Sequence, residues 1–450
     1  MELTRIDLEN KIEVSFNACR GYLSTELSLK TILFELTMKR FVDDTTYATS
    51  VDNIFIVNVM KNLYSKDEKQ NLVVFEEVGR VIEEAHEIPK GLFNDFFTEL
   101  YRQQNWSKAI AKSMDIIAGI DTIKNQSLLS DTLAKLIIEY SDMRSSTFTS
   151  NRTVTSLLKI ITDVQSYEKL LDGTIGYGIS AVACTENMNA RIIGVDKNRS
   201  ALMIAAMYCI LSGKTDIQLY ENDFTLWDTT EKYEKIAMDI PFGVKVGELI
   251  GTQKELAQKW FGIDNIKSLE WIMLAKTLEL LKENGKAVVM VPQGVAFKSG
   301  KYEKQFKNNV LENNLLSAVI SLPPLYTYTG IRTSILVFEN NSQNTVVIDL
   351  DNNSDQFFIK ERNRIVDMSE QGKVLIRELL SKRQELSRIS AIVSYEEFEK
   401  KNFDLSAAKY VMEHETIKYR TVKEIDKELD ENYAKLKQLI TKGTGFELFQ

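Results

Sequence analysis

The sequence predicts a doubly wound α/β sheet, preceded by an all-helical N-terminal region and followed by a helical tail. From about residue 143 to residue 345, apolar runs of strand length alternate with helical segments. This alternation is typical of a mainly parallel sheet that is covered on both faces. The run Gly285–Pro292 is largely apolar, as expected for a strand buried on both sides. Before residue 140, apolar residues recur at the helical period instead.

Periodicity places the individual elements. In the first 140 residues, the expected helices are Leu29–Phe41, Asn71–Ala85, Gly91–Gln103, Ser107–Ala118 and Leu128–Tyr140. Apolar stripes at this spacing are far more often core than ligand sites, and this region shows no catalytic pattern. A helix is then expected at Val154–Val164, followed by strands at Tyr167–Leu171, Arg191–Val195, Ile217–Tyr220, Lys235–Met238, Gly285–Pro292, Leu315–Pro323 and Thr333–Glu339. Val346–Asp351 is expected to add an edge strand, and Gly372–Ile389 a helix.

The tail Thr421–Lys442 has apolar residues close to a heptad seam. They are Val422, Ile425, Leu429, Tyr433, Leu436 and Leu439. Two interpretations remain open: an amphipathic helix packed on its own domain, or a helix that faces one partner helix, which suits so narrow a seam.

Composition limits the classes of function. A chain of 450 residues is long enough for two or three domains. The formal charge of −8 argues against a protein that coats nucleic acid by bulk charge. Three cysteines and two histidines give no metal-ligand spacing, so no metal site is expected, and so few cysteines fit a reducing cytoplasm. We expect no signal peptide, no membrane span and a soluble, cytoplasmic protein.

The stretch Leu170–Ser180, LLDGTIGYGIS, predicts a ligand-binding turn. Its apolar approach ends at Asp172, and Gly176 and Gly178 open the following helix. Glycine lets the backbone come close to a ligand because it has no side chain and tolerates positive φ. A glycine pair alone is weak evidence, so the residues that follow at set intervals decide its value.

Acidic residues end the strands that follow this turn. Asp196 closes the second strand, eighteen residues after Gly178, where a carboxylate suits a nucleoside ribose. Asp223 follows the third strand, and Asp239 ends the fourth within D-I-P-F. Because parallel strands end at one edge, these residues predict a single crevice there. Each aspartate taken alone is about equally well explained as the cap of the next helix.

Taken in order, these motifs resemble a known family. The Phe148-Thr149 loop, the D-G-T-I-G-Y-G turn and the D-I-P-F strand end are similar to the modification subunit of type I restriction–modification systems, which is an N6-adenine DNA methyltransferase. Later segments that share this resemblance are 287–297, 318–338 and 402–411. The resemblance extends over roughly residues 1–450 and is clearest from Ser146 to Phe338. It implies a Rossmann-like methyltransferase sheet that uses S-adenosylmethionine.

The resemblance also implies two groups of site residues. The group that binds the cofactor is Phe148, Thr149, Asp172, Gly176, Tyr177, Gly178, Asp196 and Asp223. The catalytic group, which holds the target adenine, is Asp239, Ile240, Pro241 and Phe242. Within the first group, Asp196 is expected to hold the ribose and Asp223 to lie beside the adenine ring of the cofactor.

Domain organisation and partners follow from the same resemblance. We expect a helical domain at 1–142, a methyltransferase domain at 143–395 and a helical partner-binding tail at 396–450. The expected partners are double-stranded DNA and a specificity subunit, which is contacted by the N-terminal helices and the C-terminal helix. The resemblance also allows a nuclease-translocase subunit as a further partner, and it implies no membrane.

The chemistry of adenine methylation agrees with D-I-P-F. An exocyclic adenine amine is a poor nucleophile because its lone pair is delocalised into the ring. The Asp239 side chain and the Ile240 carbonyl are two acceptors that could draw the nitrogen toward tetrahedral geometry. Phe242 could stack on a base flipped from the duplex, which is worth about 1–3 kcal/mol. The main catalytic contribution would be alignment, and no metal is needed.

Departures from the family pattern keep other functions open. The family's Thr-Pro is Thr149-Ser150, its glycine turn loses a proline and the last glycine, and N-P-P-F becomes D-I-P-F. Ile240 leaves φ less restricted than proline and adds an N–H donor. A weakened or inactive methyltransferase-fold scaffold is therefore one alternative. A methyltransferase for RNA or protein glutamine is another, and a dinucleotide dehydrogenase explains the turn and Asp196 but not D-I-P-F.

Overall fold

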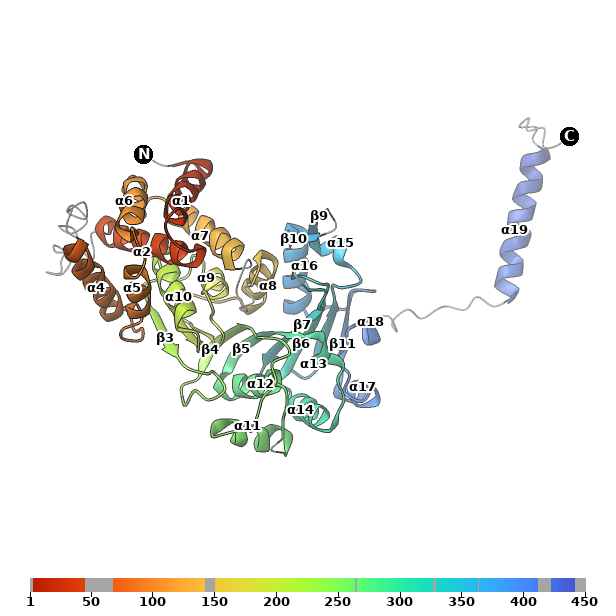
Figure 1. Ribbon diagram of the computed structural model, residues 1–450. Coiled ribbons are helices and arrows are strands. Elements are labelled where there is room, and N and C mark those ends of the chain that lie inside the picture. The colour runs from red at the N-terminus through yellow and green to blue at the C-terminus, as the bar shows by residue number, and fades with distance from the viewer. Residues whose placement is uncertain are drawn as a thin grey trace.

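The computed structural model describes residues 3–44, 68–141, 150–263, 265–326, 329–362, 364–411 and 422–441. Its centre is a nine-stranded sheet with the strand order β11-β8-β6-β7-β5-β4-β1-β2-β3 (Figure 1). The strands are β1 (Lys169–Asp172), β2 (Arg191–Asp196), β3 (Ile217–Glu221), β4 (Tyr233–Asp239), β5 (Leu281–Pro292), β6 (Leu316–Leu322), β7 (Thr333–Glu339), β8 (Thr345–Asp349) and β11 (Ser390–Val393). A mixed α/β fold with a central sheet is what the sequence predicts.

The sheet is mainly parallel, and its order reverses at β1. β1 pairs in parallel with β2 on one side and with β4 on the other, while β7 is antiparallel to both β5 and β6. The chain therefore leaves β1 toward β2 and β3 and later returns to the opposite side of β1 as β4. Such a reversal opens a crevice at the carboxyl ends of the two strands, which is where ligands bind in open α/β sheets.

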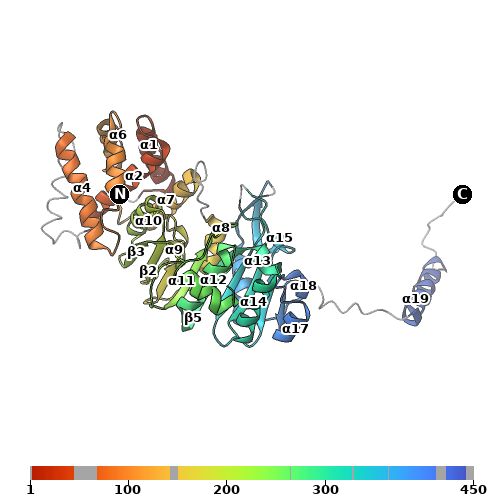
Figure 2. The ribbon, with the colours of Figure 1, turned by 60° about the horizontal axis from the view of Figure 1, so that its bottom comes forward.

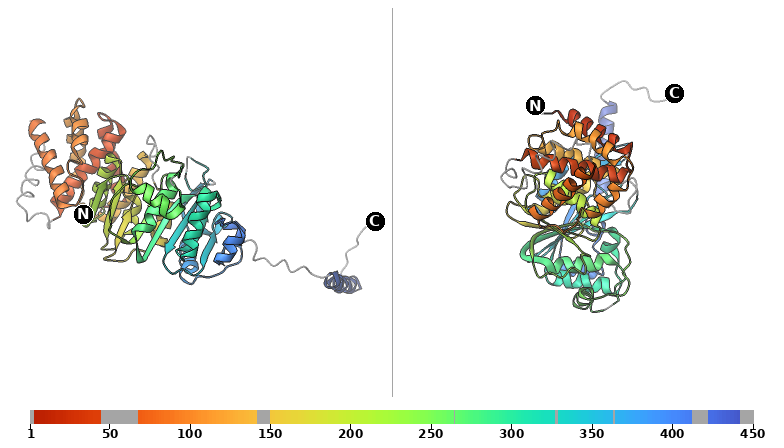
Figure 3. Two further views of the ribbon diagram at one scale, coloured as in Figure 1. Left: turned by 90° about the horizontal axis from the view of Figure 1, so that it is seen from below. Right: turned by 60° about the vertical axis from the view of Figure 1, so that its left-hand side comes forward.

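Helices cover both faces of the sheet, as the two further viewing directions show (Figures 2 and 3). Consecutive residues of β1 separate the two cores: Leu170 packs with the helices of one face and Leu171 with those of the other. The first face carries α8 (Arg152–Thr162), α9 (Ile179–Cys184), α10 (Arg199–Leu211) and α16 (Glu370–Ser381). The second carries α11 (Thr252–Phe261), α12 (Leu269–Leu280), α13 (Gln293–Phe297), α14 (Lys301–Glu312), α17 (Tyr395–Lys400) and α18 (Ala408–Val411).

The N-terminal region is helical and packs on the first face through α10. Its helices are α1 (Arg5–Arg20), α2 (Thr25–Asp43), α4 (Glu68–Ala85), α5 (Asn94–Tyr101), α6 (Trp106–Ile117) and α7 (Gln126–Ser141). The segment after α4 also covers the edge of the sheet. Glu87 accepts a hydrogen bond from the Leu219 N–H at 2.8 Å and donates to the Ile217 carbonyl at 3.2 Å. β3 therefore does not present a fully unpaired edge.

The structure corrects two expectations for the region after β7. β8 is not an edge strand, because β11 pairs antiparallel with its outer side. The helix expected at Gly372–Ile389 begins at Glu370 and ends at Ser381, and Arg383 turns the chain away with φ of +47°. This region also contains the short helix α15 (Ser354–Phe357) and an antiparallel hairpin of β9 (Phe358–Glu361) and β10 (Arg364–Met368), which periodicity does not predict.

The expected tail helix is α19 (Val422–Thr441), drawn beyond the body in Figure 1. Its apolar residues Leu429, Tyr433 and Leu436 are 55%, 71% and 55% exposed. An amphipathic helix packed on its own domain would bury them, so the structure does not support that interpretation for these side chains. Among the described residues, no helix is both long and apolar enough to cross a membrane.

Candidate active site

The strand ends that the sequence predicts to share one edge do so, and β1 and β4 end side by side at the point where the strand order reverses. Asp172 closes β1 and is buried, while Asp239 closes β4 and is partly buried. Thr174 lies between them. Its backbone N–H donates to Asp172 Oδ1 at 3.0 Å, and its hydroxyl lies 3.4 Å from the backbone carbonyl of Asp239. Residues 67 positions apart in the chain are thereby joined at the point where the strand order reverses.

The glycine turn that follows β1 needs its glycines. Gly176 and Gly178 have φ of +51° and +81°, which side chains rarely tolerate. Tyr177 between them is partly buried against the first core. Gly173 is needed for a different reason, because a Cβ there would lie 2.4 Å from Cδ2 of Phe224. The turn is therefore bare backbone, and at Gly173 it is pressed against an aromatic ring.

We expect Gly173→Ala to destabilise the protein by about 1–3 kcal/mol, because the new methyl group overpacks against the buried ring of Phe224. Adding Phe224→Leu should recover part of this loss, since leucine has no ring at that place. Chemical denaturation of the two single variants and the double variant measures the coupling. Gly247→Ala is the control, because no atom lies within 4 Å of its new Cβ. Additive losses at positions 173 and 224 would contradict the predicted contact.

Asp196 connects the end of β2 to the glycine turn. Its Oδ2 accepts the Gly176 N–H at 2.9 Å, and its Oδ1 accepts the Asn198 N–H at 2.8 Å. The cap of α10 is Asn198, whose side chain accepts the Ala201 N–H, so Asp196 is not the helix cap. Each carboxylate oxygen can accept a second hydrogen bond, which leaves capacity for ligand hydroxyl groups.

Asp223 lies at the same edge, but its hydrogen bonds are to the turn that follows it. Its Oδ1 accepts the backbone N–H of Thr225 at 2.9 Å and the Thr225 hydroxyl at 2.6 Å. These bonds shape the turn that places Phe224 against Gly173. The structure brings Asp223 to the crevice edge as a turn-forming residue, and its role beside a cofactor ring stays a prediction.

The D-I-P-F segment turns away from β4 with each side chain fixed. Ile240 is 1% exposed in the second core, and the ring of Phe242 meets Tyr326 edge-on with centroids 5.6 Å apart. Pro241, which lies between Ile240 and Phe242 in the sequence, is partly buried. The following Gly243 donates its N–H to Glu270 at 2.6 Å, which ties the end of the segment to α12. The segment is thus anchored by the buried side chain of Ile240 and, three residues later, by the bond of Gly243.

Two hydroxyl groups that the sequence did not assign to the site contact Asp239. Ser150 donates to Oδ2 and Tyr326 donates to Oδ1, both at 2.7 Å. The sequence offered one signal for Tyr326, which belongs to the segment 318–338 that shares the family resemblance. Ser150 stood out only because it replaces the proline of the family's Thr-Pro. Phe148 and Thr149, both expected to contact the cofactor, lie outside the described residues.

Burial sets the acidity of the crevice. It raises the pKa of the Asp172 carboxyl to about 7, and the nearby Asp196 and Asp239 carboxylates add to the rise. It raises the pKa of Asp239 to about 6, although hydrogen bonds from Tyr326 and Ser150 lower it. The pKa of Asp196 is raised by burial as well. Three such carboxylates at one edge favour a cationic ligand. Its positive charge would offset the cost of burying their negative charge and reduce their mutual repulsion.

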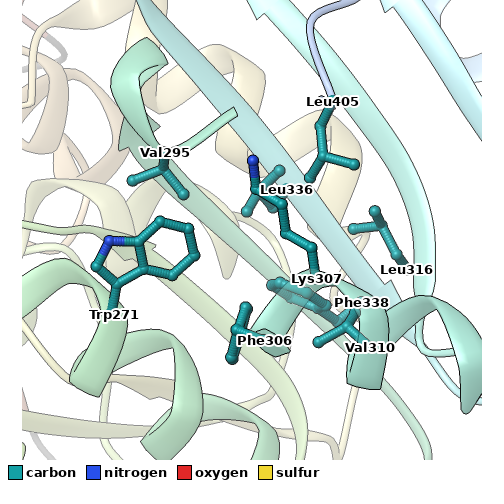
Figure 4. Close-up of a pocket in the computed structure, with 9 residues that line it drawn as sticks. All are labelled: Trp271, Val295, Phe306, Lys307, Val310, Leu316, Leu336, Phe338 and Leu405. Atoms are coloured by element: carbon teal, nitrogen blue, oxygen red, sulfur yellow. The ribbon is translucent and has the colours of Figure 1, made fainter. Parts of the chain in front are cut away.

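The residues of the crevice fit S-adenosylmethionine. The ligand carries an ammonium and a sulfonium group, which suit Asp172, and ribose hydroxyls, which suit Asp196. In the described part of the chain, no group of three or more His, Cys, Asp or Glu side chains is arranged to hold a metal ion. An apolar cavity behind the sheet, lined in part by Trp271, Lys307 and Leu405, has a volume of only about 10 Å³ (Figure 4). It is too small for a cofactor, so the sheet edge formed by the carboxyl ends of β1, β2 and β4 is the candidate site.

Comparisons with known proteins show the family of the chain. A model of the family described as N-6 DNA Methylase matches residues 124–418. The methylase subunit of the type I restriction enzyme MpnII from Mycoplasma pneumoniae is 26% identical over 166 residues, which are 37% of this chain and 30% of that protein. The methylase subunit of the Escherichia coli enzyme EcoEI is 26% identical over 216 residues, 42% of each chain. The chain thus spans less than half the length of these curated relatives.

A solved structure shows the fold over nearly the whole chain. It is the methyltransferase subunit of a type I restriction–modification system from Streptococcus thermophilus, with a TM-score of 0.74 and 21% identity over 91% of this chain and all of that one. At this identity the likeness concerns the fold. The family model, in contrast, matches well over half of the sequence, including β1, β4 and the glycine turn. The chain belongs to the N-6 DNA methylase family.

Proposed function

We propose that this protein is the modification subunit of a restriction–modification complex and transfers a methyl group from S-adenosylmethionine to N6 of adenine in duplex DNA. The observation that carries this proposal is that Asp239, the first residue of D-I-P-F, lies beside the glycine turn and Asp172. Acceptors for an amine and acceptors for a cationic methyl donor are thereby brought to one crevice. The family membership agrees with this arrangement.

Asp239 and Ile240 present two acceptors to the target amine. The carboxylate keeps lone pairs free beyond those used by Ser150 and Tyr326. Ile240 lacks the restricted φ of a proline, and its buried side chain would have to limit backbone motion in its place. Two acceptors on the two N–H bonds draw the amine nitrogen toward tetrahedral geometry and free its lone pair. Phe242, which is partly buried beside Tyr326, offers an aromatic face for a flipped base.

The residues that would hold the cofactor are those around the glycine turn. Asp172 would accept from the ammonium group, Asp196 from the ribose hydroxyls, and the backbone of Gly176 and Gly178 would lie against the chain of the ligand. Phe148, Thr149, Tyr177 and Asp223 complete this proposed set. When bound, S-adenosylmethionine supplies an electrophilic methyl group, so the contribution of the protein is alignment.

The proposal includes three domains and a partner. We propose a helical domain at 1–142, a methyltransferase domain at 143–395 and a partner-binding tail at 396–450. The relatives are named methylase subunits, which supports a complex with a specificity subunit and DNA. The exposed seam of α19 supports contact with another helix. All three cysteines are buried and free, in line with a reducing cytoplasm.

Mass spectrometry of DNA nucleosides tests the activity. The protein, purified in complex with its specificity subunit, is incubated with unmethylated duplex DNA and S-adenosylmethionine, and the DNA is digested. We expect N6-methyl-2′-deoxyadenosine to appear only when the cofactor is present. Methylated cytosine, or no methylated nucleoside despite cofactor binding, would contradict the proposal. The second of these results would favour the alternative of an inactive methyltransferase-fold scaffold.

A further inference from the structure

Asp239 is held by two hydroxyl groups from distant parts of the chain. Ser150 precedes α8, and Tyr326 follows β6; they lie 89 and 87 residues from Asp239 in sequence. Each donates to a different carboxylate oxygen at 2.7 Å. A carboxylate that receives one hydroxyl on each oxygen has little freedom to rotate about its terminal bond. We call these three residues the hydroxyl clamp.

The two donors are themselves fastened together. Asn151, next to Ser150, caps α8 by accepting the Val154 N–H at 3.0 Å. Its side-chain amide donates to the backbone carbonyl of Leu325, the neighbour of Tyr326, at 2.8 Å. The segments that carry the two hydroxyls are therefore joined one residue away from the clamp, so the start of α8 and the loop after β6 act as one support.

Because Tyr326 is buried, its hydroxyl keeps its proton and donates a hydrogen bond to Asp239. The side chain is 9% exposed and packs edge-on against Phe242. Its oxygen reaches Asp239 Oδ1 and lies 3.2 Å from the sulfur of Met290, a weak acceptor. Burial and the neighbouring Asp239 carboxylate raise the pKa of the Tyr326 phenol, so it keeps its proton and donates it. Ser150, in contrast, is only partly buried.

The hydroxyl clamp influences whether Asp239 is charged or protonated when an amine binds beside it. Hydrogen bonds donated to a carboxylate favour its charged form, which has two acceptor oxygens. A protonated carboxyl group would place an O–H donor where an amine N–H needs an acceptor. Burial alone favours that protonated form. The two hydroxyls act against burial and leave one or more lone pairs on each oxygen for the incoming amine.

We propose that Ser150 and Tyr326 are positioning residues that keep the Asp239 carboxylate charged and in one orientation, so that it accepts from an exocyclic amine of the substrate. This inference rests on the proposed function for the identity of the substrate, whereas the effect on Asp239 belongs to the protein alone. The two can therefore be tested separately.

The first test needs no substrate. Stability of the parent, Ser150→Ala and Tyr326→Phe is measured by chemical denaturation from pH 3 to pH 9. In the folded protein Asp239 stays protonated up to about pH 6, whereas the unfolded chain ionises near pH 3.8, so stability falls between these values and levels off above pH 6. This levelling-off has its midpoint at the folded pKa, and removing a hydroxyl should move that midpoint upward by about one pH unit. The same substitutions made together with Asp239→Asn should leave the pH dependence unchanged.

The matched controls remove hydroxyls elsewhere. Tyr395→Phe deletes a bond to Asn308, and Ser130→Ala deletes a bond to Ser212, and neither bond involves Asp239 or its two donors. They should not move the midpoint, and Ser150→Thr, which retains a hydroxyl, should restore it. If Ser150→Ala and Tyr326→Phe both leave the midpoint in place, the clamp does not exist.

The second test uses methyl transfer by the complex. Each clamp variant should lower kcat at pH 6 by about fivefold or more, because a one-unit rise in the pKa of Asp239 leaves about a tenth of this carboxyl charged instead of half. KM for S-adenosylmethionine should be unchanged, and the loss that comes from protonation should disappear as the pH rises. An unchanged or higher kcat in Tyr326→Phe would overturn the positioning role. A midpoint that shifts as expected in a protein that does not methylate DNA would support the clamp and refute the proposed function.

Discussion

Asp172→Asn is expected to make the ligand-free protein more stable at pH 8, although it removes a proposed cofactor-binding residue. Asp172 is 3% exposed, and burial raises its pKa from 3.8 to about 7. Below pH 3.8 the carboxyl is protonated in both the folded and unfolded states. Between pH 3.8 and about pH 7 the carboxyl is ionised in the unfolded chain but still protonated in the folded protein. Stability therefore falls as the pH rises toward 7 and stays low above it.

The expected gain follows from the size of this shift. At about 1.4 kcal/mol per pKa unit, the charged Asp172 costs the folded state up to about 4 kcal/mol at pH 8. Asparagine keeps the oxygen that accepts from Thr174 but carries no charge. We expect chemical denaturation to show a gain of about 2–4 kcal/mol at pH 8 and almost none at pH 4. Asp355→Asn, whose side chain is 87% exposed, is the control. Equal gains in stability at pH 8 and pH 4 would show that ionisation of Asp172 does not destabilise the folded protein.

Replacing Asp239 is expected to have the largest effect on activity. Asp239→Ala removes the side-chain acceptor and should lower the rate of methyl transfer by on the order of 10²–10³. Asp239→Asn keeps an acceptor oxygen and should retain much more activity. Because asparagine does not titrate, the decline in rate that we expect as the pH falls through about 6 should vanish in this variant.

Rates are measured in single turnover with the complete complex and duplex DNA. The control is Asp349→Ala, because Asp349 is also buried and ends a strand parallel to β6, but its side chain accepts hydrogen bonds from its own turn. It should leave the rate within a few-fold of the parent. Equal rates for the parent and Asp239→Ala would exclude Asp239 as a catalytic residue and would point to a scaffold.

Local patterns in the sequence were enough to predict much of the fold. The strands near the glycine turn are short apolar runs that end in aspartate or glutamate, and parallel pairing brings those ends together. Asp172, Asp196 and Asp239 could therefore be assigned to one edge. Asp223 could be placed there too, but its bonds to Thr225 depend on a turn that periodicity does not define.

The errors arose where tertiary contacts outweigh local pattern. β11 has only the four residues Ser390–Val393, and it is a strand because β8 has a free side. The helix α16 ends before Arg383, which adopts positive φ without being glycine or asparagine, so the sequence shows no stop signal there. Ser150 and Tyr326 were missed as site residues because their contacts with Asp239 span nearly ninety positions. No periodicity relates residues at that separation.

Titration of the protein with S-adenosylmethionine in a calorimeter tests the central claim most directly, because the crevice beside β1 must bind the methyl donor before any other step. We predict saturable binding to the parent, binding to Asp355→Ala with unchanged affinity, and at least about hundredfold weaker binding to Asp196→Ala, which loses a charge-assisted acceptor. Circular dichroism and unfolding curves show whether the variants are folded. Absence of binding to the folded parent, with its specificity subunit and DNA present, or equal affinity in Asp196→Ala, would contradict the account.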